Sequence, residues 1–227
     1  MKCLMKNLII LFALMFLALL FLGRTAYKSY SEGGKESKQE VKLNEGKGNK
    51  NFEIFEVTGD KKKQMEESLG YEIAEIKHIK LIDNDDYTKE EVINKEAYTI
   101  ENISEVKNAI EFSGRDVWEL NYKNKEYKKA GIKIGNKILK NDYMVDLPMD
   151  AKIISNALGF DVEKKNTIDL DLEIKVEGKT FATLSLYPEI NDYDFEIHKD
   201  GEKKSEGSAK EVVGAYLIVR KEQINES

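Results

Sequence analysis

The stretch Ile168–Val176 alternates strictly between aliphatic and polar side chains, and this pattern constrains the fold more than any other part of the sequence. Its aliphatic residues are Ile168, Leu170, Leu172, Ile174 and Val176, and its polar residues are Asp169, Asp171, Glu173 and Lys175. Successive side chains of a β-strand point to opposite faces. The pattern therefore predicts a strand with one face buried and the other in solvent, as in an antiparallel sheet.

The rest of the C-terminal half indicates further antiparallel strands joined by tight turns. We expect strands over Thr180–Tyr187, ended by Pro188, and over Tyr193–His198. Asp200-Gly201 is a strong hairpin signal. The continuous apolar run Val212–Val219 predicts a central strand that is covered on both faces.

The middle of the chain indicates a mixture of short helices and strands. Strands are expected over 52–57, 71–82, 98–100, 117–122, 132–134 and 137–139, and helices over 61–69, 89–94 and 147–158. Ile103, Val106 and Ile110 also fit one helix face, which predicts a helix that begins at Asn102 or Ser104 and ends at Gly114. The expected fold class is therefore α+β: a mainly antiparallel β-sheet with a few short helices.

An unbroken apolar run, Leu8–Leu22, lies near the N-terminus between basic residues. As a helix its fifteen residues span about 22 Å, less than the hydrocarbon core of about 30 Å, and this length favours a cleaved signal peptide. The cleavage sites are poor, because a cut after Ala26 places Arg24 third before the bond and a cut after Gly23 places Phe21 there. We expect an uncleaved signal-anchor, with a secreted protein as the alternative.

Composition divides the chain into three parts. Residues 1–26 form the signal-anchor or signal peptide, 27–51 a flexible spacer rich in Gly, Ser, Lys and Glu, and 52–223 an extracytoplasmic domain, with a further division near residue 114 as an alternative. Residues 1–52 have a net charge of +5, so the total of −6 leaves −11 for residues 53–227. Such an acidic domain repels nucleic acid.

Known catalytic and ligand motifs are absent from the sequence. His78 and His198 stand in expected strands without a second ligand at metal-binding spacing, and Cys3 is the only cysteine. No HExxH, GxSxG or glycine-rich phosphate loop occurs. We therefore expect neither a metal, a cofactor nor an enzyme. The acidic turn Asp83–Asp86 resembles the start of a calcium loop, but its following residues do not fit one.

One weak binding feature remains, an acidic stripe on the expected sheet. Its residues are Asp169, Asp171, Glu173, Asp194 and Glu196. If the two strands present these carboxylates on one face, they form a surface for a basic partner or for weakly bound divalent ions; the plainer interpretation is a solvated sheet face.

These observations favour a membrane-anchored, protein-binding module of a bacterial cell surface. An immunity or inhibitor protein, or an accessory subunit of a membrane complex, has this organisation of anchor, spacer and acidic domain. The alternatives are a hydrolase that uses carboxylates and a purely structural component of the envelope.

Overall fold

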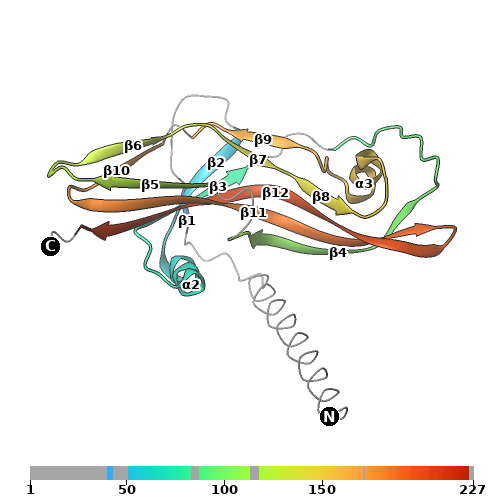
Figure 1. The fold of residues 1–227 in the computed structure, drawn as a ribbon, viewed down its shortest axis with the longest axis horizontal. Coiled ribbons are helices and arrows are strands. Elements are labelled where there is room, and N and C mark those ends of the chain that lie inside the picture. The colour runs from blue at the N-terminus through green and yellow to red at the C-terminus, as the bar shows by residue number, and fades with distance from the viewer. Residues whose placement is uncertain (1–39, 43–50, 83–86, 113–117, 171, 225–227) are drawn as a thin grey trace, which may run out of the picture. The chain divides into compact units, whose positions relative to one another are not determined.

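In a computed structural model of the chain, two strands near the C-terminus form a long hairpin (Figure 1). β11 (Thr180–Lys199) has 20 residues and β12 (Glu202–Gln223) has 22, whereas strands of globular proteins usually have about five or six. Asp200 and Gly201 join them with φ values of 53° and 76°. Two successive positive φ values are the mark of a type I′ turn, whose twist suits a hairpin, so the predicted Asp-Gly turn is confirmed.

The structure describes residues 40–42 (backbone only), 51–82, 87–112, 118–170 and 172–224, all of which belong to the second of two compact units, Met1–Lys35 and Glu36–Ser227. The remaining strands are β1 (Glu40–Lys42), β2 (Phe52–Val57), β3 (Glu75–Leu81), β4 (Thr99–Ile110), β5 (Trp118–Asn124), β6 (Ala130–Ile134), β7 (Lys137–Lys140), β8 (Asp142–Val145), β9 (Lys165–Ile168) and β10 (Leu172–Val176). The two helices of the described part are α2 (Gly59–Leu69) and α3 (Ala151–Leu158). All strand pairs are antiparallel, so the predicted mainly antiparallel α+β fold is confirmed for these residues.

The membrane segment expected at Leu8–Leu22 lies outside the described residues. Within the ranges that the structure describes, no helix has the length and apolar character needed to cross a membrane. Of the expected spacer, the structure describes β1, which pairs with β2, and Asn51.

The neighbours of the long hairpin differ between its two halves. In the proximal half, made of 180–188 and 215–223, the strand order is β5-β11-β12-β3-β2-β1. In the distal half, made of 189–199 and 202–214, the order is β4-β11-β12-β8. The central position of β12 agrees with the prediction for Val212–Val219, which is buried on both faces through most of its length.

Pro188 does not end a strand as predicted, because β11 continues through it to Lys199. The outer neighbour of β11 changes at this residue: β5 pairing ends at Leu186, and β4 pairing starts at Glu189. The Pro188 carbonyl accepts a hydrogen bond from the Glu111 amide, so this edge of Pro188 faces β4. The missing N–H of Pro188 therefore lies between the β5 and β4 pairings of β11, where it interrupts neither set of backbone hydrogen bonds.

Two small sheets, β6-β10 and β7-β9, lie with α3 on one side of the hairpin, and α2 lies on the other side (Figure 1). The inward residues of the small sheets share the main core with β11 and β12; they include Ile168, Leu170, Leu172, Ile174 and Val176. A second core joins α3 to the distal half through Ile154, Phe160, Tyr193 and Phe195. On the α2 side, Met65, Ile76, Tyr216 and Ile218 are buried.

The helix predicted between Asn102 or Ser104 and Gly114 is wrong, because these residues form the edge strand β4. Two irregularities in its pairing with β11 explain the error: Glu101 to Ser104 and Val106 to Ala109 each oppose a shorter step on β11. Asn102 and Asn108 have positive φ values of 52° and 53°, as in β-bulges. Each bulge adds one residue, so side chains on one face of β4 are three residues apart instead of two at these points. A spacing of three is typical of a helix.

Other expected boundaries are also corrected. The segment 89–94 has no regular helix, and the single strand expected over 168–176 is divided into β9 and β10, which pair with different strands. The helix expected over 147–158 begins at Ala151, because the Asp150 carboxylate caps it by accepting a hydrogen bond from the Lys152 amide at 2.9 Å.

Candidate functional site

The distal half of the sheet has one face packed against α3 and an opposite face that carries exposed polar residues. Tyr193, Phe195 and Ile197 of β11 point into the α3 core, so Asp194 and Glu196 point to the other side. Direct cross-strand pairing places further residues beside them. This surface, which we name the open sheet face, comprises Glu101 and Ser104 of β4, Asp194 and Glu196 of β11, Glu206 and Ser208 of β12, and Met144 of β8.

Glu196 is the centre of an electrostatic network on the open sheet face. It lies directly opposite Glu101 on one side and Glu206 on the other, an arrangement that is repulsive without counter-charges. Lys203 supplies one, with its ammonium 2.7 Å from Glu196 and 2.6 Å from Glu206. The hydrogen bonds from Lys203, from His198 and from the Asn102 amide lower the pKa of Glu196 to about 2.

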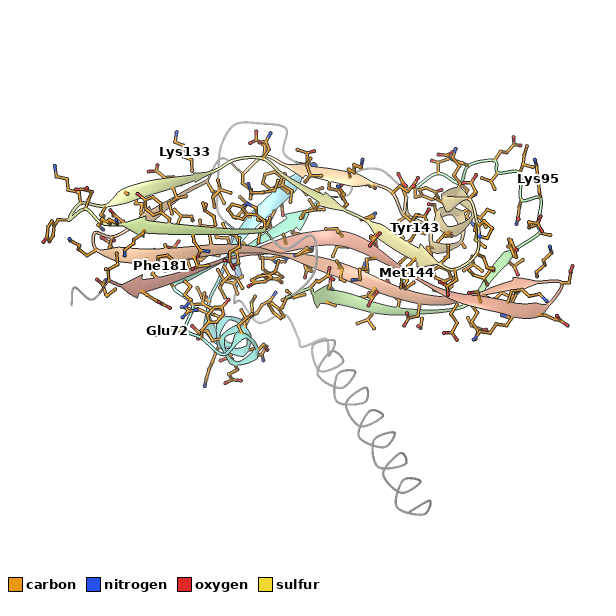
Figure 2. All side chains as sticks on the ribbon, viewed as in Figure 1. Glu72, Lys95, Lys133, Tyr143, Met144 and Phe181 are labelled. Carbon is orange, nitrogen blue, oxygen red and sulfur yellow. The ribbon has the colours of Figure 1, made fainter. Side chains whose placement is uncertain are left out.

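Asp194 and Met144 lie on the open sheet face but outside this network. Within the described part of the chain, the exposed Asp194 carboxylate has no hydrogen bond or ion pair. Met144 is 69% exposed, while its neighbour Tyr143 packs against the α3 core; both are labelled on β8 in Figure 2. A free carboxylate and an exposed thioether side chain are therefore available on the same face, joined through Ser208.

The structure does not bring the two parts of the predicted acidic stripe together. Asp169 follows β9 and Glu173 lies in β10, both exposed on the outer side of the small sheets. Asp194 and Glu196 belong to the large sheet and face away from α3. Asp171 lies outside the described residues, as does the acidic turn Asp83–Asp86.

Two carboxylates of the open sheet face, Glu101 and Glu206, were missed by the sequence reasoning. Glu101 stands in a segment that was assigned to a helix. Glu206 follows the Asp-Gly turn, but an irregularity between Ile197 and His198 shifts the register of the hairpin beyond that turn. Only the pairing shows that both residues flank Glu196.

On the inner face of the distal half, Tyr193 joins two further carboxylates. Its hydroxyl lies 2.9 Å from Glu105 Oε1 and 3.2 Å from Glu211 Oε2. Burial and these two negative partners raise the pKa of Tyr193 above its ordinary value. The tyrosine therefore stays protonated and acts as a hydrogen-bond donor between β4 and β12.

A cleft of about 760 Å³ lies between α3, the segment around Glu90 and β12. Its polar groups bond to one another: the Asn141 amide donates to the Asp161 carbonyl at 2.8 Å and accepts from the Val212 amide at 2.8 Å. Glu90 forms an ion pair with Lys152. These contacts tie the walls of the cleft together, so its geometry is that of a structural junction.

Among the residues that the structure describes, no group of three or more His, Cys, Asp or Glu side chains is arranged to hold a metal ion. His198 contacts Glu196 at 3.0 Å and Glu101 at 3.7 Å, and it belongs to the network on the open sheet face.

No protein family and no curated protein matches the chain. Among solved structures, the chain is similar to a crystal structure from Bacteroides vulgatus titled "Putative pore-forming toxin". The sequence identity is 11%, the match covers 85% of this chain and 80% of that chain, and the TM-score is 0.26. A likeness with so low a TM-score carries no argument about this protein.

Proposed function

We propose that the protein is a membrane-anchored, extracytoplasmic protein-binding module of a bacterium, and that it binds its partner through the open sheet face. The observation that carries this proposal is that the free Asp194 carboxylate and the side chain of Met144 are both exposed on the same sheet face, with Ser208 between them. Carboxylates and an apolar side chain together fit a partner surface with Lys or Arg around an apolar group.

The face is a better candidate than the strand edge beside it. β4 is an edge strand, and an exposed edge is a template for strand addition. Its two bulges at Asn102 and Asn108 interrupt the row of backbone groups, and bulges of this kind protect edges against pairing. Recognition through side chains of the face is therefore favoured over addition of a strand.

An immunity or inhibitor protein, or an accessory subunit of a membrane complex, fits this proposal. The alternative of a carboxylate-dependent hydrolase needs two convergent carboxylates in a cleft. The cleft described above is lined by the carboxylates of Glu90, Asp161, Glu163 and Glu211. Glu90 is paired with Lys152, Glu211 accepts hydrogen bonds from Asn191 at 2.9 Å and from Tyr193, and Asp161 accepts one from the Glu163 amide at 2.9 Å. These engaged carboxylates give the hydrolase less support than the open sheet face gives a binding module.

Co-purification from solubilised membranes tests the proposed function. The full chain is expected to recover a stoichiometric partner, and the double variant Asp194→Lys with Glu206→Lys to lose it. The matched control, Asp169→Lys with Glu173→Lys, makes the same charge change on the outer side of the small sheets and should retain the partner. Absence of a stoichiometric partner, or equal loss in both variants, contradicts the proposal.

The membrane anchor is tested separately by fractionating cells that express the full chain. We expect the protein in the membrane fraction at the size of 227 residues, with its C-terminal domain accessible to protease from outside. Recovery from the medium of a protein that starts near residue 27 would show a cleaved signal instead.

A further inference from the structure

A buried polar cluster lies in the layer between the sheet and α2. His78 of β3 and Glu189 of β11 are each 6% exposed, and their Nε2 and Oε2 atoms are 2.7 Å apart. The Tyr216 ring of β12 stacks on the His78 ring, with centroids 4.4 Å apart and planes at 5°. The Tyr216 hydroxyl donates to Glu189 Oε1 at 3.3 Å. Three neighbouring strands therefore meet through side chains at one point.

Gly214 makes this contact possible. β12 lies between β3 and β11, so the His78–Glu189 pair must cross it, and it crosses at Gly214, which is paired with both Lys80 and Glu189. A Cβ atom on Gly214 would lie 2.7 Å from Glu189 Oε2 and 3.5 Å from His78 Nε2. The absent side chain provides the space in which the carboxylate reaches the imidazole.

Both oxygens of Glu189 have a partner. The Tyr216 hydroxyl donates to Oε1, and His78 Nε2 lies 2.7 Å from Oε2. A buried carboxylate needs a counter-charge, and within the described part of the chain His78 is the ionisable cation that contacts it. An ionised Glu189 is neutralised by this contact when the imidazole is protonated.

We propose that His78 and Glu189 form a proton-dependent latch that holds the α2 side of the sheet closed and weakens as the external pH rises above neutrality. The inference does not depend on the proposed binding partner. In the closed state the buried carboxylate retains the imidazole proton. Once the layer opens and His78 meets water, it keeps that proton only below about pH 6.5.

The direction of the pH dependence follows from counting protons in the two states. Between about pH 4.3 and pH 6.5, an exposed His is protonated and an exposed Glu is ionised, so opening neither binds nor releases a proton. Above that range opening releases one proton and becomes up to about tenfold more favourable per pH unit. The latch is therefore tighter in mildly acidic surroundings than above neutrality.

Other charged and titratable groups face this side of the sheet from the described elements around the latch. They include Lys61 of α2, Glu53 of β2, Lys80 of β3, Tyr187 of β11 and Arg220 of β12, together with Tyr71, which hydrogen-bonds to Tyr187, and Glu119 of β5. Lys61 lies closest to the stack, with its ammonium 5.0 Å from the centre of the Tyr216 ring. Its positive charge opposes protonation of His78, whereas the direct contact with Glu189 at 2.7 Å favours it.

Thiol labelling of the full-length chain measures the opening directly. In a Cys3→Ser background, Met65→Cys places a thiol at a fully buried position of α2, and Lys63→Cys places one at an exposed position of the same helix. The ratio of their maleimide labelling rates cancels the ionisation of the thiol itself. We expect this ratio to rise between about pH 6.5 and pH 8.5 by up to about tenfold per pH unit.

The isosteric variant Glu189→Gln supplies the control, because it keeps the shape of the cluster and removes the charge that retains the proton. In that background the labelling ratio should be nearly independent of pH over the same range. A flat ratio with Glu189 present, or an equal slope in the Glu189→Gln background, overturns the proposal. If Met65→Cys does not fold, hydrogen exchange of α2 in the Cys3→Ser chain, corrected for the intrinsic pH dependence of exchange, gives the same comparison.

Discussion

At the scale of single residues, the structure depends on how it accommodates two carboxylates. The carboxylate of Glu189 occupies the space left by the missing side chain of Gly214. The carboxylate of Glu196 is held between two other carboxylates by three hydrogen-bond donors. Neither role is visible in the sequence, where partners such as His78 and Glu189 are 111 residues apart.

The variant Gly214→Ala should destabilise the protein. Its Cβ would lie 2.7 Å from both Glu189 Oε2 and the Ile79 carbonyl oxygen, and overpacking of this kind typically costs about 1–3 kcal/mol. Urea unfolding at pH 7 measures the loss. Gly135→Ala is the matched control, because a Cβ there meets no atom within 4 Å; equal midpoints for the two variants would contradict the prediction.

The variant Lys203→Met should raise the pKa of Glu196 from about 2 toward its ordinary value of 4.5. His198 and Asn102 keep it from reaching that value. A lowered carboxyl pKa stabilises the fold at pH values above the ordinary one, and that contribution disappears as the pH falls from 4.5 to about 2. Carboxyl NMR titration measures the shift, and Lys204→Met, which removes the partner of Glu202 instead, should leave Glu196 unchanged.

At the scale of secondary structure elements, prediction succeeded where one residue type determined the local geometry. The helices expected to end at residues 69 and 158 do end there, because Gly70 and Gly159 follow with positive φ. It failed where the pattern depended on a neighbouring strand. The residues of β4 fit a helical spacing because its bulges depend on β11. Proline usually ends a strand, but β11 continues through Pro188 because the missing N–H falls where β11 changes its outer neighbour.

The bulge at Asn108 of β4 predicts a difference between adjacent positions. Asn108→Val places a β-branched residue at a φ of 53°, which costs about 1–2 kcal/mol, whereas Lys107→Val changes an exposed neighbour outside the positive-φ region. Free energies of unfolding in urea should fall for the first and stay within about 0.5 kcal/mol for the second. Asn108→Gly should retain the stability of the unchanged protein, and a loss as large as that of the valine variant would argue against a conformational cause.

At the scale of the whole described domain, β11 and β12 pass through both the main core and the α3 core. The sequence indicated their apolar residues, but it did not show that one hairpin connects the cores. For the same reason only part of the candidate site could be foreseen: Asp194 and Glu196 share a strand, whereas Glu101 and Glu206 reach them through pairing, and Asp169 and Glu173 belong to other sheets.

A continuous hairpin predicts that the domain unfolds as one unit. Phe160→Ala, a change in the α3 core, should lower the free energy of unfolding by about 3–5 kcal/mol. Trp118, the only tryptophan, packs against the main core, so its fluorescence should report the same shift as far-UV circular dichroism. A transition in which Trp118 fluorescence is unmoved, while circular dichroism shows two steps, would show that the cores unfold independently.

The position of β12 also has a consequence for biosynthesis. This strand follows all the other described strands in the sequence but lies between β3 and β11 in the sheet, so the native sheet is incomplete until residues near Gln223 leave the ribosome. Chains are made from the N-terminus at about 5–20 residues per second, and long-range strand pairing is slow. The nascent chain thus stays without its complete native sheet until β12 has been synthesised.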